Sequence, residues 1–327
     1  DLLAAGLVRA ENVHSADLVM VNSCGFIIDA TVESLDTLFE LHRQRKKNSV
    51  LVLCGCLPAR YSLNRSINEV DIFLPWDKHD QLIPRLKEHG WRLEVPANFI
   101  KRIKPTQPYG YLRISEGCDN CCAYCAIPYI KGPFLSRSEA EIVREAEYLC
   151  SEGVKELVLI GQDTTLYGRD NGNSGALPSL LDRLVSIDGC DWIRLMYAHP
   201  AHLDDDTIDA MAAHDKIVKY IDLPLQHIND RILMSMNRRI DRKGIISLIE
   251  KLRSRMTGIS IRTTFIVGFP GETDRDFEEL LDFCEEIRFD SVGVFKYSPE
   301  DGTPAEEFPG RVGKDIVEER YLTLMDL

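Results

Sequence analysis

The chain has 327 residues, of which 44% are apolar and 28% charged, and this is ordinary for a soluble globular protein with one large α/β domain and a smaller one. No apolar run is long enough to cross a bilayer and no secretory signal is visible, so we expect a cytoplasmic protein without a membrane partner. The net charge of −13 argues against a protein that binds nucleic acid mainly through phosphate contacts, and it suits a basic partner better. A small basic patch is still compatible with this total charge.

The first residue is Asp1 rather than Met, and an apolar run with helical spacing begins at once at Leu2, Leu3 and Leu7. We therefore expect a helix there and further residues upstream. Alternating strands and helices follow, which predicts a small doubly wound α/β domain over residues 1–95. Its expected strands are Leu18–Ser23, Val50–Leu53 and Ile72–Leu74, and its expected helices are 30–47 and 79–89.

Residues 96–108 are basic and contain prolines, and we interpret them as a linker. From residue 109 to 315 six strand–helix units follow, with strands that are apolar on both faces. This pattern predicts a parallel sheet with right-handed crossovers, curled as a partial (β/α)6 barrel whose chemistry lies at the carboxyl ends of its strands. The expected strands are 109–115, 156–162, 192–197, 219–225, 259–267 and 291–297, and the expected helices are 138–152, 178–187, 205–213, 229–255 and 273–287.

The ten cysteines of a chain of this length indicate metal or redox chemistry rather than a disulfide framework. Cys118, Cys122 and Cys125 have the spacing C-x3-C-x2-C on one loop after the first barrel strand. Three thiolates can ligate three irons of a [4Fe–4S] cluster and leave the fourth iron open to a small molecule. Next to a sulfonium, such a cluster can pass on one electron and break a carbon–sulfur bond. The alternative is a zinc site, which would need a fourth thiolate or imidazole.

This motif, with Tyr124 before its last cysteine, resembles that of the radical S-adenosylmethionine superfamily. The resemblance implies a [4Fe–4S] cluster held by the three cysteines, S-adenosylmethionine as cofactor, and Tyr124 near its adenine. Simple packing of the loop is the alternative for Tyr124.

Two further cysteines follow the first two strands of the small domain, Cys24 after Val21-Asn22-Ser23 and Cys56 after Gly55. Strand ends of a doubly wound sheet meet at one edge, so these two thiols can share a metal cluster, or they can be small buried residues.

Together with the loop motif, these positions make the whole chain similar to the methylthiotransferase family, which carries a second [4Fe–4S] cluster on three cysteines of its first domain. Cys24 matches one of them, with Ser23 in place of a threonine, and Cys56 matches another. The third ligand would lie upstream of Asp1, and Cys54 is a fallback. The resemblance further implies that residues 316–327 begin the connection to a carboxyl-terminal TRAM domain.

Several other residues at predicted strand ends are candidates for binding the cofactor. By resemblance, Gln162 and Asp163 stand where related enzymes hold its amino group, and Gly268 lies against the adenosine. A helix cap is the alternative for Asp163. Gln226 ends the fourth barrel strand, and Arg194 is either a contact of cofactor or substrate or a buried ion pair. His199 and His202 suggest a metal pair, but without carboxylate or cysteine partners we interpret them as loop residues.

Within the methylthiotransferase family two substrate classes compete. Four stretches resemble the group that adds a methylthio group to the β-carbon of an aspartate in ribosomal protein S-twelve: residues 114–120, 162–165, 225–228 and 293–298. The resemblance implies one S-adenosylmethionine as methyl donor to sulfur and a second one as source of a radical that removes a hydrogen from the aspartate. It also implies the small ribosomal subunit or its protein as partner, and an electron donor such as flavodoxin. The alternatives are a transfer-RNA adenosine methylthiotransferase and a zinc-binding scaffold without activity.

Overall fold

A computed structural model of the chain describes residues 2–61, 67–95 and 105–327. They divide into two compact units, Asp1–Ile103 with Ala126–Gly132, and Lys104–Cys125 with Pro133–Leu327. Most of the expected linker, residues 96–104, lies outside the described residues. In the described ranges, no helix has the length and apolar character that crossing a membrane requires.

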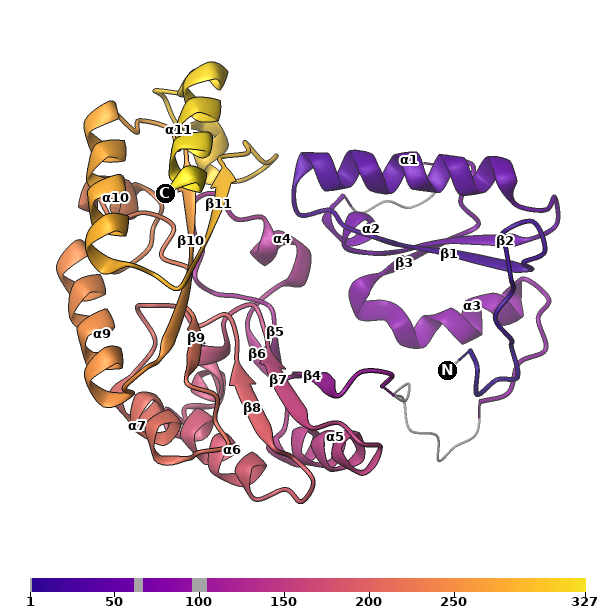
Figure 1. Cartoon of the computed structure of the whole chain (residues 1–327). Coiled ribbons are helices and arrows are strands. Elements are labelled where there is room, and N and C mark those ends of the chain that lie inside the picture. The colour runs from indigo at the N-terminus through magenta and orange to yellow at the C-terminus, as the bar shows by residue number, and fades with distance from the viewer. Residues whose placement is uncertain (1, 62–66, 96–104) are drawn as a thin grey trace. The chain divides into compact units, whose positions relative to one another are not determined.

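The first unit is built on a parallel sheet in the order β1-β2-β3, with β1 Leu18–Ser23, β2 Val50–Gly55 and β3 Ile72–Pro75. Helix α1 (Ile28–Gln44) covers one face and α3 (Leu82–Glu88) the other (Figure 1). Successive residues of β2 point to opposite faces, so Leu51 packs with Leu38 of α1 while Val52 packs with Leu86 of α3. The doubly wound arrangement is therefore confirmed.

The helix expected from Leu2 is wrong. Residues 2–6 form turns, closed by a hydrogen bond from the Leu7 N–H to the Leu2 carbonyl at 3.1 Å. Gly6 has a φ of 87°, a left-handed conformation that ends any helix at this point. Leu2 and Leu7 still bury apolar surface, because both pack against the core on the α3 side of the sheet.

The second unit contains six parallel strands in two neighbouring sheets of order β4-β7-β8 and β9-β10-β11. Isolated bridging between Ile193 and Ile217 continues the first sheet toward the second. The strands curl with helices on their outer side (Figure 1), which confirms the predicted partial barrel. Their bounds are β4 Tyr109–Arg113, β7 Glu156–Ile160, β8 Trp192–Leu195, β9 Tyr220–Asp222, β10 Ser260–Val267 and β11 Ser291–Lys296.

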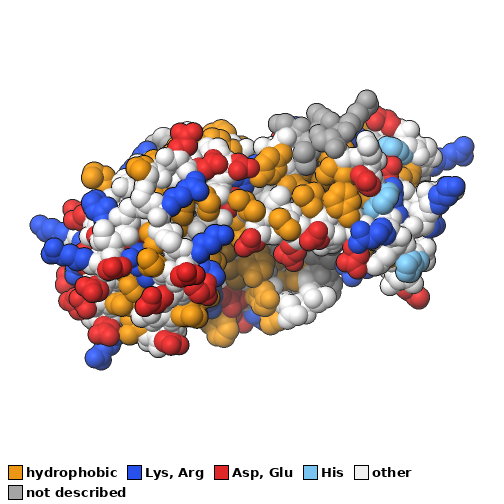
Figure 2. Space-filling view, turned by 90° about the horizontal axis from the view of Figure 1, so that it is seen from above, with side chains coloured by type: hydrophobic (Ala, Val, Ile, Leu, Met, Phe, Trp, Pro, Cys, Tyr) orange, Lys and Arg blue, Asp and Glu red, His pale blue; other side chains and the backbone are white. Residues whose placement is uncertain are grey.

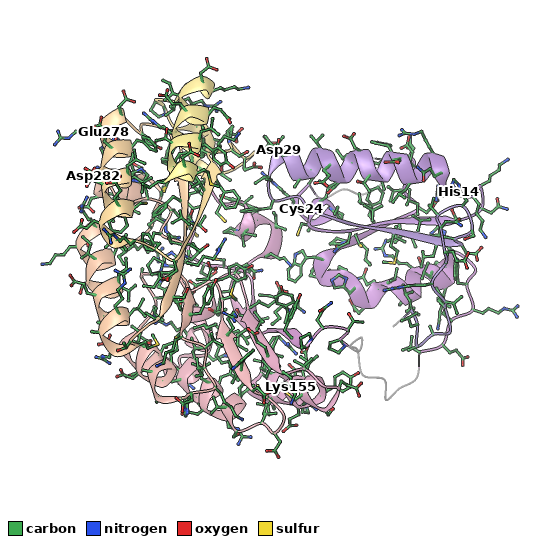
Figure 3. The ribbon with its side chains drawn as sticks, viewed as in Figure 1. His14, Cys24, Asp29, Lys155, Glu278 and Asp282 are labelled. Carbon is green, nitrogen blue, oxygen red and sulfur yellow. The ribbon has the colours of Figure 1, made fainter. Side chains whose placement is uncertain are left out.

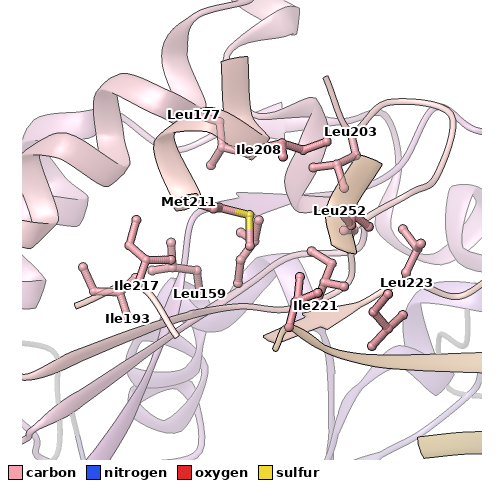
Figure 4. Close-up of a cluster of buried hydrophobic side chains, with 14 of the residues drawn as sticks. Leu159, Leu177, Ile193, Leu203, Ile208, Met211, Ile217, Ile221, Leu223 and Leu252 are labelled. Atoms are coloured by element: carbon pink, nitrogen blue, oxygen red, sulfur yellow. The ribbon is translucent and has the colours of Figure 1, made fainter. Parts of the chain in front are cut away.

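Outer helices alternate with these strands, and their apolar faces make one continuous core with the sheet (Figure 4). The helices are α5 Glu139–Ser151, α6 Ala176–Val185, α7 Asp205–Ala213, α8 Asp230–Ser235, α9 Arg242–Arg255, α10 Asp274–Ile287 and α11 Lys314–Asp326. Shorter elements are α2 Cys56–Arg60, α4 Ile127–Lys131, β5 Ser115–Glu116, β6 Leu135–Ser136, and the 3-10 helices Trp76–Gln81, Thr164–Leu166, Arg169–Asn171 and Pro304–Glu307.

The single helix expected over 229–255 is wrong, because the chain breaks it into α8 and α9. Asn237 and Arg239 have φ values of 57° and 54°, which no α-helix accommodates. Asp241 then starts α9, and its side chain accepts the Gly244 N–H at 2.7 Å as an N-cap. The break leaves a short irregular segment between the two helices, and this segment, which includes the buried Met236 and Arg238, contributes to the site described below.

Candidate functional site

The loop after β4 carries the three cysteines of the predicted cluster. Cys122 is buried, Cys118 and Cys125 are half-buried, and Cys121 between them is exposed. Cys121 has a φ of 50°, so the chain turns sharply at this residue. The Cys125 N–H donates to the Cys122 carbonyl at 3.0 Å and closes a tight turn. The loop thus sets Cys121 apart from the three cysteines of the motif.

The segment between α8 and α9 braces this loop. Asn237 Nδ2 donates to the Cys121 carbonyl at 2.9 Å, and the Ala123 N–H donates to the Met236 carbonyl at 3.0 Å. The helical pattern of the sequence does not single out these residues. The signal was present, since an asparagine that tolerates left-handed backbone stands in the middle of an otherwise helical pattern.

Arg238 is the buried cation of the site. It is only 4% exposed, its Nη1 lies 3.4 Å from the Cys122 Sγ, and its Nη2 donates to the Pro224 carbonyl. Burial by itself would lower the pKa of Arg238, but the neighbouring Tyr124 and Cys122 outweigh it and raise that pKa. A permanent positive charge therefore lies beside a thiol that would become a thiolate on binding metal.

The chemistry of the three thiols suits a cluster. Cys118, Cys122 and Cys125 lie on one short loop, and three thiolates can ligate three irons of a [4Fe–4S] cluster. A structural zinc ion would take a fourth thiolate or imidazole. Burial raises the pKa of Cys118 to about 11, so this thiol needs a metal to deprotonate it near neutral pH. The three residues fit a [4Fe–4S] cluster.

Tyr124 packs against a small apolar cluster beside the loop, which contains Ile232, Met236, Phe269 and Ala305. Burial is the main cause that raises the pKa of its hydroxyl well above the ordinary value, so the phenol stays neutral. The packing that was the alternative for this residue is thus present in the structure.

Gln162 and Asp163 follow β7 and differ in whether their side-chain oxygens already accept hydrogen bonds from the protein. Gln162 Oε1 is buried and has no hydrogen-bond partner, so it is an acceptor that a ligand can use. Asp163 is 1% exposed and caps the following 3-10 helix by accepting the Thr165 N–H at 3.0 Å. The cap that was the alternative for Asp163 is therefore present.

The other three residues predicted to contact the cofactor, Arg194, Gln226 and Gly268, make contacts within the protein. Arg194 pairs with Glu156 at 2.6 Å and lies over the Tyr220 ring, 4.8 Å from its centroid, so the ion pair considered as its alternative is present. Gln226 has a φ of 73° and links β9 to β10, since its N–H donates to the Thr264 carbonyl at 2.8 Å.

Gly268 ends β10 with a φ of 77°. A Cβ added to it would lie 2.5 Å from the Cγ2 of Val317 in α11. Glycine is therefore required here both by the backbone and by the close approach of α11.

His199 and His202 do gain a carboxylate partner, Asp163, and potential ligand atoms of the three residues lie within 4.8 Å of one another. However, the two rings are stacked, with centroids 4.6 Å apart and planes only 25° apart. An imidazole nitrogen binds metal along the plane of its ring, and two stacked rings cannot both direct a nitrogen at one ion. These described residues form a hydrogen-bonded network instead, in which His202 Nδ1 contacts Asp163 Oδ2 at 2.8 Å.

In the first unit, Cys24 lies between the end of β1 and the start of α1 (Figure 3), and Cys56 begins α2 directly after β2. The two segments touch, since a Cβ on Gly25 would lie 3.2 Å from the Cys56 carbonyl carbon. The structure therefore brings the two cysteines to one sheet edge. Cys54 does not share that edge, because its buried thiol donates to the Val21 carbonyl at 3.3 Å.

Comparison with known proteins agrees with this geometry. The radical SAM superfamily matches residues 112–284, and the uncharacterized protein family UPF0004 matches residues 1–75. The solved structure of the radical S-adenosylmethionine methyltransferase TsrM from Kitasatospora setae superposes with a TM-score of 0.66 at 16% identity, covering 88% of this chain and 63% of that chain. At that identity the likeness shows the fold alone.

Sequence relatives are much nearer. The ribosomal protein uS12 methylthiotransferase RimO of Geotalea uraniireducens is 44% identical over 328 residues, which is 95% of this chain and 73% of that protein. The protein of the same name from Clostridium tetani is 42% identical over 325 residues, again 95% and 73%. These matches confirm the family resemblance seen in the motifs, and the superfamily implies a [4Fe–4S] cluster and S-adenosylmethionine. The chain belongs to the RimO family of radical SAM methylthiotransferases.

Proposed function

We propose that the chain transfers a methylthio group to the β-carbon of an aspartate in ribosomal protein uS12. The observation that carries the proposal is the cysteine loop of a radical SAM barrel in a chain that is 44% identical to a uS12 methylthiotransferase over 95% of its length. The target of that relative, a protein of the small ribosomal subunit, becomes the proposed partner of this chain.

Cys118, Cys122 and Cys125 are the proposed ligands of the radical SAM cluster. When bound, that cluster supplies the electron that cleaves the carbon–sulfur bond of S-adenosylmethionine. The chain itself contributes placement: Arg238 faces the Cys122 sulfur, and Asn237 fixes the loop backbone. Gln162 offers its unpartnered Oε1 to the cofactor's ammonium group.

The remaining candidate contacts surround the same strand ends. We assign Tyr124, Gln226 and Gly268 to the wall of the cofactor-binding site. Tyr124 lies on the cysteine loop, Gln226 follows β9 and Gly268 follows β10. Arg194, which is paired with Glu156 on the strands themselves, is assigned to the barrel lining.

Cys24 and Cys56 are the proposed protein ligands of a second [4Fe–4S] cluster. Support comes from their position at one sheet edge and from their match to two of the three cysteines that hold a second cluster in the methylthiotransferase family. Two thiols do not complete the set of three that the family uses, so a third ligand is needed from another segment.

The remaining proposals concern partners and location. The chain's charge of −13 suits a basic protein substrate. On the face shown in Figure 2, basic side chains are interspersed with acidic ones and form no continuous stripe. An electron donor such as flavodoxin and a cytoplasmic location complete the proposal.

The test supplies anaerobically reconstituted protein with S-adenosylmethionine, a reductant and either small ribosomal subunits or transfer RNA. We expect mass spectrometry to find a methylthio group on one uS12 aspartate and unmodified RNA. Modified RNA with untouched uS12 would transfer the assignment to the RNA-modifying enzymes. Zinc in place of iron and sulfide in the purified protein would end the enzymatic proposal.

A further inference from the structure

Asp163 is buried in a network of hydrogen bonds next to the cysteine loop. We propose that Asp163 is a positioning residue that holds Asn120, and through it Cys118, rather than a contact of S-adenosylmethionine. The proposal rests on the radical SAM assignment of this loop but does not depend on which molecule accepts the methylthio group.

The Asp163 carboxylate has no acceptor site left for a ligand. Oδ2 accepts from Asn120 Nδ2 and from His202 Nδ1, each at 2.8 Å. Oδ1 accepts from the Thr165 N–H at 3.0 Å and from the Thr165 hydroxyl. A carboxylate offers about four lone-pair sites, and four donors occupy them here. An ammonium group could enter only by displacing one of them.

These donors also settle the charge of the group. Burial by itself would raise the pKa of Asp163, but hydrogen bonds from His202, Thr165 and Asn120, together with the effect of His199, outweigh it and lower that pKa. A negative charge that is 1% exposed is thus held close to the cysteine loop.

Asn120 connects this charge to the cluster ligand. It stands two residues after Cys118 and is 5% exposed. Its side-chain Nδ2 donates to Asp163 at 2.8 Å, and its carbonyl accepts from Asn237 Nδ2 at 3.4 Å. Asn120 is therefore held by both its side chain and its backbone, which fixes the short loop segment that begins at Cys118. Outer groups of this kind orient the ligands of a metal site and tune it.

The far side of the network is anchored to the barrel. The His199 N–H donates to the Thr165 hydroxyl at 3.3 Å, and the Thr164 hydroxyl donates to the Met196 carbonyl at 2.6 Å. These bonds tie the segment after β7 to the segment after β8. Asp163 is thereby held by the segments that follow β7 and β8, and it can fix the position of the Asn120 side chain.

The test compares Asp163→Asn with the double variant Asp163→Asn plus Asn120→Asp. The single variant removes the charge, and its amide has to set its N–H₂ group either against the Asn120 N–H₂ or against the Thr165 N–H. The double variant restores the Asn–Asp hydrogen bond with its direction reversed and keeps one negative charge in the pair. The second N–H of the introduced amide can donate to His202 Nδ1 after a change of tautomer.

For Asp163→Asn we expect a higher midpoint potential of the reconstituted cluster, because a nearby negative charge disfavours the reduced state. We also expect an altered electron paramagnetic resonance spectrum and at least a tenfold slower formation of deoxyadenosine without uS12. The dissociation constant of S-adenosylmethionine should change by less than twofold, and the double variant should recover the potential and most of the rate.

A tenfold weaker binding of S-adenosylmethionine at an unchanged potential would make Asp163 a cofactor contact and overturn the proposal. So would a double variant no better than the single one. If Asp163→Asn loses its iron, recovery of iron in the double variant supports the proposal and continued loss refutes it. Asp290→Asn is the matched control, since Asp290 accepts the Ile261 N–H at 2.8 Å at the amino end of β10 and should change none of these readouts. Failure to modify uS12 would sink the proposed function alone, because none of these measurements uses uS12.

Discussion

The two cysteine-bearing edges of the molecule follow the same rule of placement but differ in how they are supported. Both lie where parallel strands end, at β1 and β2 in the first unit and after β4 in the second. In the second unit, side chains from other parts of the barrel reach the cysteine loop, among them Arg238, Asn237 and Asp163. At the edge of the first unit, Cys24 is exposed and its N–H donates to the Ser34 hydroxyl at 3.0 Å. The comparison teaches that side chains from distant parts of the second unit hold its cysteine loop in place, whereas in the first unit Cys24 lies exposed at the sheet edge.

The largest expected effects come from removing one cysteine from each edge. Cys122→Ala removes a ligand of the radical SAM cluster, so we expect deoxyadenosine formation and uS12 modification both to fall to background. Cys24→Ala removes a ligand of the proposed second cluster. It should abolish uS12 modification, lower the iron content, and leave deoxyadenosine formation within about twofold, roughly 0.4 kcal/mol in barrier height.

Mass spectrometry of uS12 and chromatographic measurement of deoxyadenosine separate the two variants. Cys121→Ala is the control, because Cys121 is an exposed residue of the same loop that we assign no ligand role. Full methylthio transfer by Cys24→Ala would show that the first edge holds no catalytic cluster, and the functional contrast between the two edges would disappear.

The period of the apolar residues and the spacing of the strands explain why the strands and helices that surround both edges could be predicted. Strands such as Leu157–Ile160 are apolar on both faces, and this pattern has few interpretations other than a parallel sheet covered by helices. The irregular joints were harder to predict. Asn237 is a local sign of the break between α8 and α9, but the contacts of Asn237 and Arg238 with the distant cysteine loop, which hold the break in place, are visible only in the fold.

The residues of the site also divide into those that the sequence predicts and those that only the fold reveals. The loop cysteines share one short segment, so their spacing alone reveals them as a set. Asp163 and Asn120 lie 43 residues apart, and their bond is invisible without the fold. The sequence shows that Asp163 can accept hydrogen bonds, but only packing decides that four protein donors already occupy it.

A buried ion pair anchors α11 to the second unit and provides a test of its rigidity. Arg320 Nη1 lies 3.0 Å from Glu272 Oε1, with the two side chains 5% and 0% exposed. Arg320→Met leaves the Glu272 carboxyl buried without this partner, and since burial already raises its pKa to about 7, the group would take up a proton, so we expect a cost of about 1–3 kcal/mol. Glu272 also accepts the Gly268 N–H at 2.6 Å, so loosening should spread to the end of β10.

Urea unfolding followed separately in the two units measures this loss. We expect the transition of the second unit to move to lower urea while that of the first unit stays in place. Glu318→Gln is the control on the same helix. Its exposed pair with Lys296 at 2.8 Å should contribute less than about 1 kcal/mol. A loss for Arg320→Met no larger than for this control would mean that α11 adds little to the barrel.

The smallest expected effect is a pH dependence carried by His227, which is 0% exposed at the end of β9. Burial is the main cause that lowers its pKa to about 4, against the attraction of Asp276 and Glu279 and with the help of Arg231 and Arg320. The folded chain therefore keeps His227 neutral between pH 6.5 and 4, while the unfolded chain takes up a proton. Stability is retained above pH 6.5 and falls as the pH decreases through this window.

From pH 7 to pH 5 this single residue should cost the second unit about 2 kcal/mol of unfolding free energy. His227→Gln removes the titration, so the difference in stability between the two pH values should shrink by that amount. His199, whose burial lowers its pKa to about 2, remains in the variant and keeps part of the trend. Denaturant unfolding at both pH values checks the prediction. An unchanged difference would show that His227 takes up its proton within the folded unit, and hence that burial does not keep it neutral at this strand end.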